Sequence, residues 1–137
     1  MSANELHYKS ISELSELFRS KDVSSSEVTE AMLNRLGKLN GSLHGYAVVL
    51  AERAMAQATT CDGEMAKGIW RGPLHGIPIG LKDLCYTTFA PTAGGTTIHA
   101  KFMPSFNATI VDRLERARAV TLGKLQMTEG AYTSPHP

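Results

Sequence analysis

In the first third of the chain, apolar residues recur three and four positions apart, the spacing of amphipathic helices. Two such stretches open with a capping-box pattern, in which a serine precedes a glutamate by three residues: Ser10 with Glu13, and Ser24 with Glu27. The first predicted helix has its apolar stripe at Ile11, Leu14, Leu17 and Phe18. The second runs through Val28, Ala31, Met32, Arg35, Leu36 and Leu39. We expect Asn40-Gly41 to end it, and both stripes to be packing surfaces.

The chain changes character at Gly72. Before it, residues 51–58 are rich in alanine and favour helix, whereas residues 59–72 are polar and are expected to form an exposed connection. After it, short β-like runs alternate with turns and one helix, predicted over residues 109–117 with Asn107 as its cap. A strand is predicted over residues 119–122. This alternation is typical of an α/β sheet.

Length and composition narrow the class of protein. The 137 residues, 42% of them hydrophobic, provide for one core and no second domain. A net charge of +1 argues against direct binding to nucleic acid or an anionic membrane. No apolar run approaches the roughly 18 to 20 residues of a membrane span, and residues 1–6 do not resemble a secretory signal. With Cys61 and Cys85 interpreted as free thiols, we expect a cytoplasmic protein.

Several familiar sites are not supported by the sequence. The histidines and cysteines do not pair at metal-ligand spacings, so no metal site is expected. Gly123-Lys124 is similar to the end of a phosphate-binding loop, but Leu125 follows where that loop needs serine or threonine, and Arg118 takes the place of its first glycine. No Gly-x-Ser-x-Gly nucleophile elbow is present.

The stretch that carries chemistry is residues 72–83, with the sequence GPLHGIPIGLKD. Alternate residues from Ile77 to Leu81 are branched aliphatics, which predicts a strand. Lys82 then shares the opposite face with Pro78 and Gly80, where little bulk surrounds its stem. A lysine withdrawn from water can become a neutral amine that accepts a proton from a hydroxyl nucleophile, which makes Lys82 a candidate general base. Taken alone, a lysine after a strand is more often a solvated strand end.

The same run resembles the region around the catalytic lysine of the amidase signature family. Three later segments resemble that family in the same order: a glycine-rich turn at residues 91–95, a helix at 107–114, and a strand and loop at 122–129. The resemblance covers essentially all of the chain, but only the N-terminal part of a family catalytic domain.

The resemblance implies an α/β fold in which helices pack on a mixed sheet, with residues 1–71 mainly helical and residues 72–137 beginning the α/β core of one domain. It implies hydrolysis or transfer of carboxylic amides through a Ser–cis-Ser–Lys triad. Lys82 would take a proton through a bridging serine while the second serine attacks the carbonyl. The implied substrate is a small-molecule amide, and no metal or organic cofactor is implied.

The chain departs from the family in one decisive respect. The Gly- and Ser-rich signature that carries both serines is absent and is expected beyond Pro137, because Ser105 and Ser134 are isolated. We therefore expect an amidase fragment that is inactive alone and needs its C-terminal remainder or a complementary chain. The alternatives are the amidase-like subunit of a tRNA-dependent amidotransferase, with tRNA bound through other subunits, and a non-catalytic truncated product.

Other positions take roles from the resemblance. A loop reaches toward the acyl pocket of family members, and its counterparts here are candidate substrate-binding residues: Gly130, Ala131, Tyr132 and Thr133. An ordinary loop with a glycine turn is an equal alternative. We expect Asp83 to fix the lysine region by hydrogen bonding, and we interpret His75 and the second candidate base, Lys124, as structural. Arg118 stands where a family glycine commonly ends the helix, so it predicts a strained left-handed cap or a shifted helix end.

Overall fold

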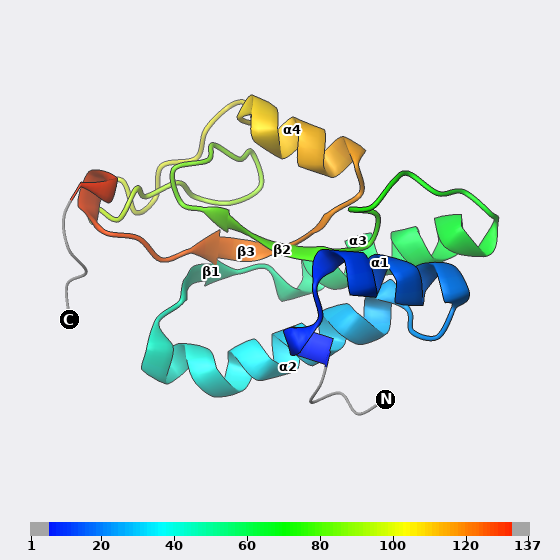
Figure 1. Ribbon diagram of the computed structural model, residues 1–137. Coiled ribbons are helices and arrows are strands. Elements are labelled where there is room, and N and C mark those ends of the chain that lie inside the picture. The colour runs from blue at the N-terminus through cyan, green and yellow to red at the C-terminus, as the bar shows by residue number, and fades with distance from the viewer. Residues whose placement is uncertain (1–5, 133–137) are drawn as a thin grey trace.

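The computed structural model describes residues 6–132, which form helices packed on a three-stranded sheet (Figure 1). The strands are β1 (Tyr46–Val49), β2 (Pro78–Lys82) and β3 (Val120–Leu125), in the spatial order β1-β3-β2. The central strand β3 pairs antiparallel with β1 and parallel with β2. The α/β fold with helices on a mixed sheet is therefore confirmed.

Four α-helices surround this sheet: α1 (Ile11–Ser20), α2 (Ser25–Leu43), α3 (Ala51–Ala66) and α4 (Thr109–Arg116). Short 3₁₀ turns, η1 (Leu6–Tyr8) and η2 (Glu129–Ala131), lie near the two ends of the described chain. In Figure 1, α4 lies above the sheet, while α2 and α3 lie below it. The long segment between β2 and α4 also rises on the α4 side, so that side carries little regular structure.

Both predicted capping boxes are confirmed. In the pairs Ser10–Glu13 and Ser24–Glu27, the serine hydroxyl accepts from the glutamate backbone N–H, and the glutamate carboxylate accepts from the serine backbone N–H. Asp62 of α3 adds a tertiary cap, because its carboxylate accepts from the first two N–H groups of α2 at 2.7 and 3.0 Å. The start of α2 is thus held both by its own sequence and by α3.

The predicted end of α2 is wrong. The helix continues through Gly41 to Leu43, and His44 ends it in the left-handed conformation with φ 48°. Asn40 does not stop the helix, because its side chain binds Tyr46: Oδ1 accepts from the Tyr46 N–H at 2.8 Å, and Nδ2 donates to the Tyr46 carbonyl at 3.1 Å. Asn40 therefore fixes the start of β1, a strand that the sequence analysis did not predict.

The predicted exposed connection after residue 58 is also wrong in its first half, since α3 extends to Ala66. Thr59 and Thr60 are accommodated because their hydroxyls donate to carbonyls one turn earlier, each at 2.9 Å. Cys61 is buried on the face that α3 turns toward β3. Small residues hide this helix from a search for apolar stripes.

The predicted helix over residues 109–117 is confirmed as α4, which is one residue shorter. Its predicted cap is wrong: Ala108 is the N-cap, and no side chain caps the helix. The Oδ1 atom of Asn107 accepts instead from the backbone N–H of Thr88 at 2.8 Å and so ties down the preceding loop. The predicted strand over residues 119–122 extends to Leu125 as β3.

Two apolar clusters join the helices to the sheet. The first contains the buried residues Leu6, Leu14, Phe18, Val28 and Ile77, and packs α1 and α2 against the residue that leads into β2. The second contains Ala54, Ala58, Cys61, Val120 and Leu122, and packs α3 against β3. Burial of each large apolar side chain stabilises the fold by about 1.5–3 kcal/mol.

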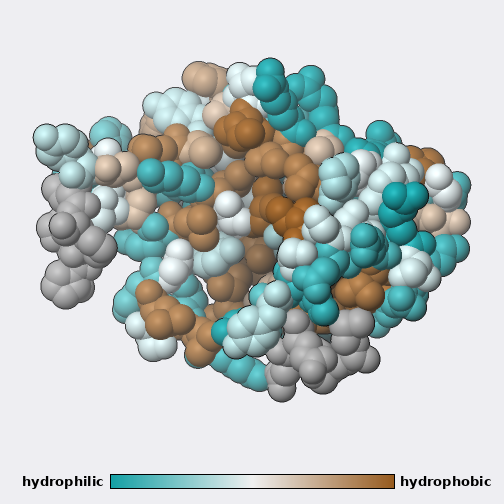
Figure 2. All heavy atoms as spheres, viewed as in Figure 1, coloured by the Kyte–Doolittle hydropathy of each residue, from teal (hydrophilic) through white to brown (hydrophobic). Residues whose placement is uncertain are grey.

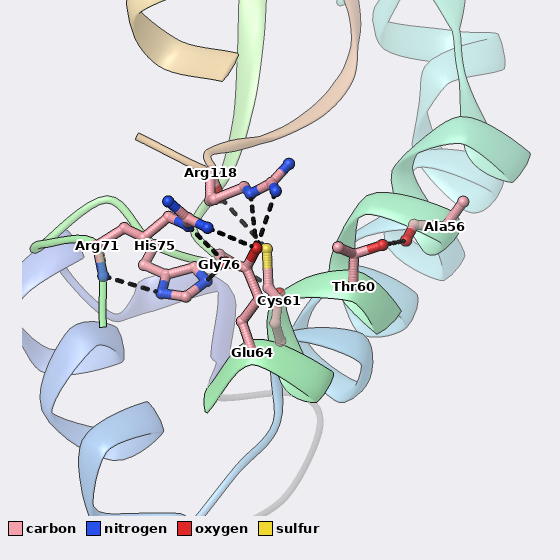
Figure 3. A network of polar contacts seen from close by, with 9 residues as sticks. Ala56, Thr60, Cys61, Glu64, Arg71, His75, Gly76 and Arg118 are labelled. Atoms are coloured by element: carbon pink, nitrogen blue, oxygen red, sulfur yellow. Dashed lines mark hydrogen bonds and ion pairs between the residues drawn. The ribbon is translucent and has the colours of Figure 1, made fainter. Parts of the chain in front are cut away.

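A polar network around Glu64 joins three segments at the start of β2 (Figure 3). The Glu64 carboxylate accepts from Arg71 at 2.7 and 3.0 Å and from Nη2 of Arg118 at 2.8 Å, and it lies 3.2 Å from Nε2 of His75. These bonds, that of Arg71 above all, lower the pKa of Glu64 to about 2. Burial lowers the pKa of His75, whose side chain is fully enclosed. The network anchors the end of α3 to the segments before β2 and β3.

Arg118 adopts the left-handed conformation, with φ 61°. Of the two outcomes expected from its sequence position, the structure shows the strained cap. Two compensations hold it there: the guanidinium binds Glu64, and the Arg118 carbonyl accepts from the Gly76 N–H at 2.9 Å. The Cys61 thiol donates to the same carbonyl at 3.5 Å.

We predict that Glu64→Gln lowers the free energy of unfolding by about 1–3 kcal/mol at pH 7, because it removes the charge that both guanidiniums bind. The folded-state pKa lies below the ordinary value of 4.5, so this stability is present above that value and is lost as pH falls toward 2. Urea unfolding of wild type and variant from pH 7 to 3 measures the difference, which should shrink with acid. Glu16→Gln on the exposed face of α1 is the control, and a pH-independent difference would contradict the prediction.

We also predict that Arg118→Ala is less stable than Arg118→Gly by about 1 kcal/mol. Both substitutions remove the bonds to Glu64, but only alanine retains the steric cost of a positive φ. The same pair of substitutions at Arg113, inside α4, should give the opposite order because glycine weakens a helix. Thermal or urea unfolding of the four variants tests this, and an alanine variant at 118 as stable as the glycine variant would disprove it.

Candidate active site

Lys82 is the last residue of β2 and lies opposite Leu125 in the parallel pairing with β3. Gly80 is required earlier in the strand, because a Cβ there would come within 2.7 Å of the Leu125 side chain and 2.9 Å of the Tyr46 hydroxyl. The expectation of little bulk around this part of the strand is therefore wrong. Lys82 itself is exposed, so residues 6–132 do not withdraw it from water.

Asp83 follows Lys82 and turns into the protein, where it is 2% exposed. Its Oδ2 atom accepts from the backbone N–H groups of Ala93 at 3.1 Å and Gly94 at 3.2 Å. Its Oδ1 atom lies 3.1 Å from the ammonium of Lys124. These are bonds of the kind expected of Asp83, and they fasten the residue after the candidate base to the loop at residues 91–95.

Lys124 of β3 is completely buried. Its ammonium donates to the Thr92 hydroxyl at 2.9 Å and the Pro91 carbonyl at 3.2 Å, besides its ion pair with Asp83. An ammonium has three protons, and three acceptors surround this one. The arrangement favours the structural interpretation of Lys124 over a second base.

The segment predicted to bind substrate adjoins the same loop. Gly130 and Ala131 lie in η2, and the Gly130 N–H donates to the Gly94 carbonyl at 2.9 Å. Tyr132 is 93% exposed, and Thr133 lies outside the described residues. Gly95 packs so closely on Met127 and Thr128 that a Cβ would meet their backbone at 2.7 Å. The structure thus links Lys82 and Gly130 through the loop at residues 91–95.

A cavity of about 410 Å³ opens beside this loop. Leu84, Tyr86 and Phe102 supply its apolar lining, and Gly130 lies at its edge. The Tyr86 and Phe102 rings meet edge to face with centroids 5.5 Å apart. Figure 2 shows hydrophobic residues gathered across the middle of the visible face, between α4 and α1 as placed in Figure 1. The side of the molecule that carries Lys82 thus also exposes apolar surface.

The remaining chemistry-bearing side chains do not form a second centre. Within residues 6–132, no three histidine, cysteine or acidic side chains cluster in a way that would hold a metal ion. Burial raises the pKa of Cys61 to about 11, so its thiol is a poor nucleophile. No helix in this part of the chain has the length and apolar character needed to cross a bilayer. Lys82 and its surroundings are therefore the candidate active site.

Comparison with known proteins places this geometry in a family. The putative amidase AmiD of Mycobacterium tuberculosis (strain ATCC 25618 / H37Rv) is 50% identical over 127 residues, which are 93% of this chain and 27% of AmiD. The amidase-related subunit of glutamyl-tRNA(Gln) amidotransferase from Moorella thermoacetica is 39% identical over 130 residues, which are 95% of this chain and 27% of that protein.

Solved structures agree. The native peptide amidase from Stenotrophomonas maltophilia superimposes with a TM-score of 0.83 at 31% identity, over 88% of this chain and 25% of the peptide amidase. The chain therefore spans about a quarter of the length of the relatives it matches. The Amidase family model matches residues 27–136, and the chain belongs to that family.

Proposed function

We propose that residues 1–137 form the N-terminal portion of a single amidase domain that hydrolyses a carboxylic amide of a small molecule, with Lys82 as general base. The observation that carries the proposal is the fixed place of Lys82: it ends a strand, and the next residue is bonded to two backbone N–H groups of the loop at residues 91–95. The proposal is supported by the 50% identity to AmiD over 93% of the chain. It requires no metal or organic cofactor, and its proposed setting is the cytoplasm.

The proposed chemistry is that of a Ser–cis-Ser–Lys triad. The neutral amine of Lys82 accepts a proton through the bridging serine as the second serine oxygen bonds to the amide carbon. The carbon–nitrogen bond then breaks, the amine leaves with a proton, and an acyl-serine remains. Water attacks this ester, the carboxylic acid leaves, and the serine regains its proton.

Neither serine of such a triad is supplied by these residues, which contain no Gly-Gly-Ser-Ser-like run. The serines would come from a segment outside the 137 residues, on the same or a complementary chain. That segment would also have to cover Lys82, because a neutral lysine is favoured by removal from water. The isolated 137-residue chain should therefore show no turnover.

The substrate would enter beside the segment that contains Gly130, Ala131, Tyr132 and Thr133. The exposed Tyr132 ring is available to contact a ligand. Since the Gly130 N–H is bonded to the same loop that binds Asp83, an acyl group held by this segment would lie near the strand end that carries the base.

A second candidate is the amidase-like subunit of a tRNA-dependent amidotransferase. The 39% identity to the glutamyl-tRNA(Gln) amidotransferase subunit from Moorella thermoacetica, over 95% of the chain, favours it. Such a subunit would release ammonia from an amide and pass it to a partner. Ammonia transfer to glutamyl-tRNA that requires added partner subunits would select this candidate over a free-standing amidase.

We predict that Lys82→Ala lowers kcat/KM for amide hydrolysis by about 10³-fold or more in the protein that joins this chain to its serine-bearing segment. Ammonia release from small aliphatic and aromatic amides measures the rate. Lys101→Ala removes another exposed lysine and should leave the rate unchanged.

Full activity in the Lys82 variant would refute the role of this residue. Absence of turnover in the wild-type protein, with both amides and a tRNA-dependent assay, would instead favour a non-catalytic truncated product. The encoding DNA past the Pro137 codon, compared with the mass of the native protein, establishes which chain must be assayed.

A further inference from the structure

We propose that Lys124 is a positioning residue, whose buried ammonium holds Lys82 and the segment at Gly130 in fixed relation to each other. The proposal rests on the amidase function proposed above. Lys124 is assigned no contact with substrate. It acts through Asp83 on one side and through the loop at residues 91–95 on the other.

The burial of Lys124 is the first observation. A lysine charge is costly to remove from water unless acceptors replace the lost hydration. Here the ammonium lies within 3.2 Å of one carboxylate, one hydroxyl and one carbonyl, provided by Asp83, Thr92 and Pro91. Two of these acceptors lie in the loop, and the third is the residue next to Lys82. The ammonium is thus the bridge between them.

The second observation is the position of these partners relative to the candidate site. Asp83 is bonded to Lys82 by a peptide bond, so a shift of its backbone displaces the base. The loop in turn carries Gly130, through the 2.9 Å bond from the Gly130 N–H to the Gly94 carbonyl. A loss of the Lys124 contacts should therefore disturb the base and the substrate segment together.

The third observation separates Lys124 from a proton-transfer role. Its side chain has no exposed surface, and an acceptor faces each of its three protons. A group in this state does not reach a substrate. Its effect on turnover must come through geometry, where a displacement of about 1 Å costs up to 10²-fold in rate.

The test compares Thr92→Val, Lys124→Met and the double variant Asp83→Asn/Lys124→Met in the complete amidase. Thr92→Val keeps both charges and removes one acceptor, and we expect kcat to fall about 3- to 10-fold. Lys124→Met should lower kcat about 10- to 100-fold and also raise KM. The double variant should melt at a higher temperature than Lys124→Met because no buried charge is left unpaired, yet its kcat should stay low.

Glu64→Gln is the matched control. It weakens a different ionic network, at the opposite end of β2, so it should lower the melting temperature while leaving kcat of the folded enzyme unchanged. A Thr92→Val variant and a folded Lys124→Met or double variant with wild-type kcat and KM would overturn the proposal. If Lys124→Met does not fold, Thr92→Val decides.

A measurement without turnover keeps this proposal separate from the proposed function. Lys82 and Lys101 compete for limiting acetic anhydride, and mass spectrometry gives the ratio of their acetylation. We expect each variant to change that ratio at least about 3-fold, because Lys82 leaves its fixed position. An inactive wild-type protein with this change would refute the amidase function but support positioning, whereas an unchanged ratio in all folded variants would refute positioning.

Discussion

Strand β2 carries the candidate base at its last residue, and a carboxylate held by cationic side chains restrains the chain at each end of this strand. Before the strand, Glu64 binds Arg71 and Arg118 and so ties α3 to the turn that enters β3. After it, Asp83 binds Lys124 and the loop N–H groups. Neither cluster is made from neighbouring residues, so both form only when the helices and strands have assembled. The direction in which Lys82 leaves the sheet therefore depends on the whole fold.

Close backbone approach is the other condition of this arrangement. A Cβ at Gly123 would collide with the Val48 carbonyl, so the central strand can lie against β1 only because that residue is glycine. The parallel register between β2 and β3 also shifts near this point, between Ile79 and Gly80. Beyond the shift, Leu81 pairs with Lys124, and Lys82 pairs with Leu125. The irregularity thus helps to bring Lys124 level with the residues that flank the base.

The sequence predicted best those features that neighbouring residues determine. The capping boxes at Ser10 and Ser24 form as expected, since both partners lie within one turn. Asn40 and Asn107 misled because their side chains bind distant backbone, a choice that local propensity does not encode. Likewise, Asp83 and Lys124 were singled out separately, but nothing in the chain between them indicates that they pair. The resemblance to a family supplied the order of the elements, and only the fold supplied that contact.

Lys82 illustrates how position and environment can be provided by different parts of a protein. The described residues determine where the base stands, yet leave its side chain in solvent and place an apolar, aromatic-lined cavity in the adjoining loops. A lysine amine becomes an effective proton acceptor only when water is excluded around it. The relatives are about four times as long as the stretch matched here, which provides ample chain to exclude that water. On this view, the ionic clusters keep the base in place before its cover arrives, and the covering segment changes its protonation without having to build its position.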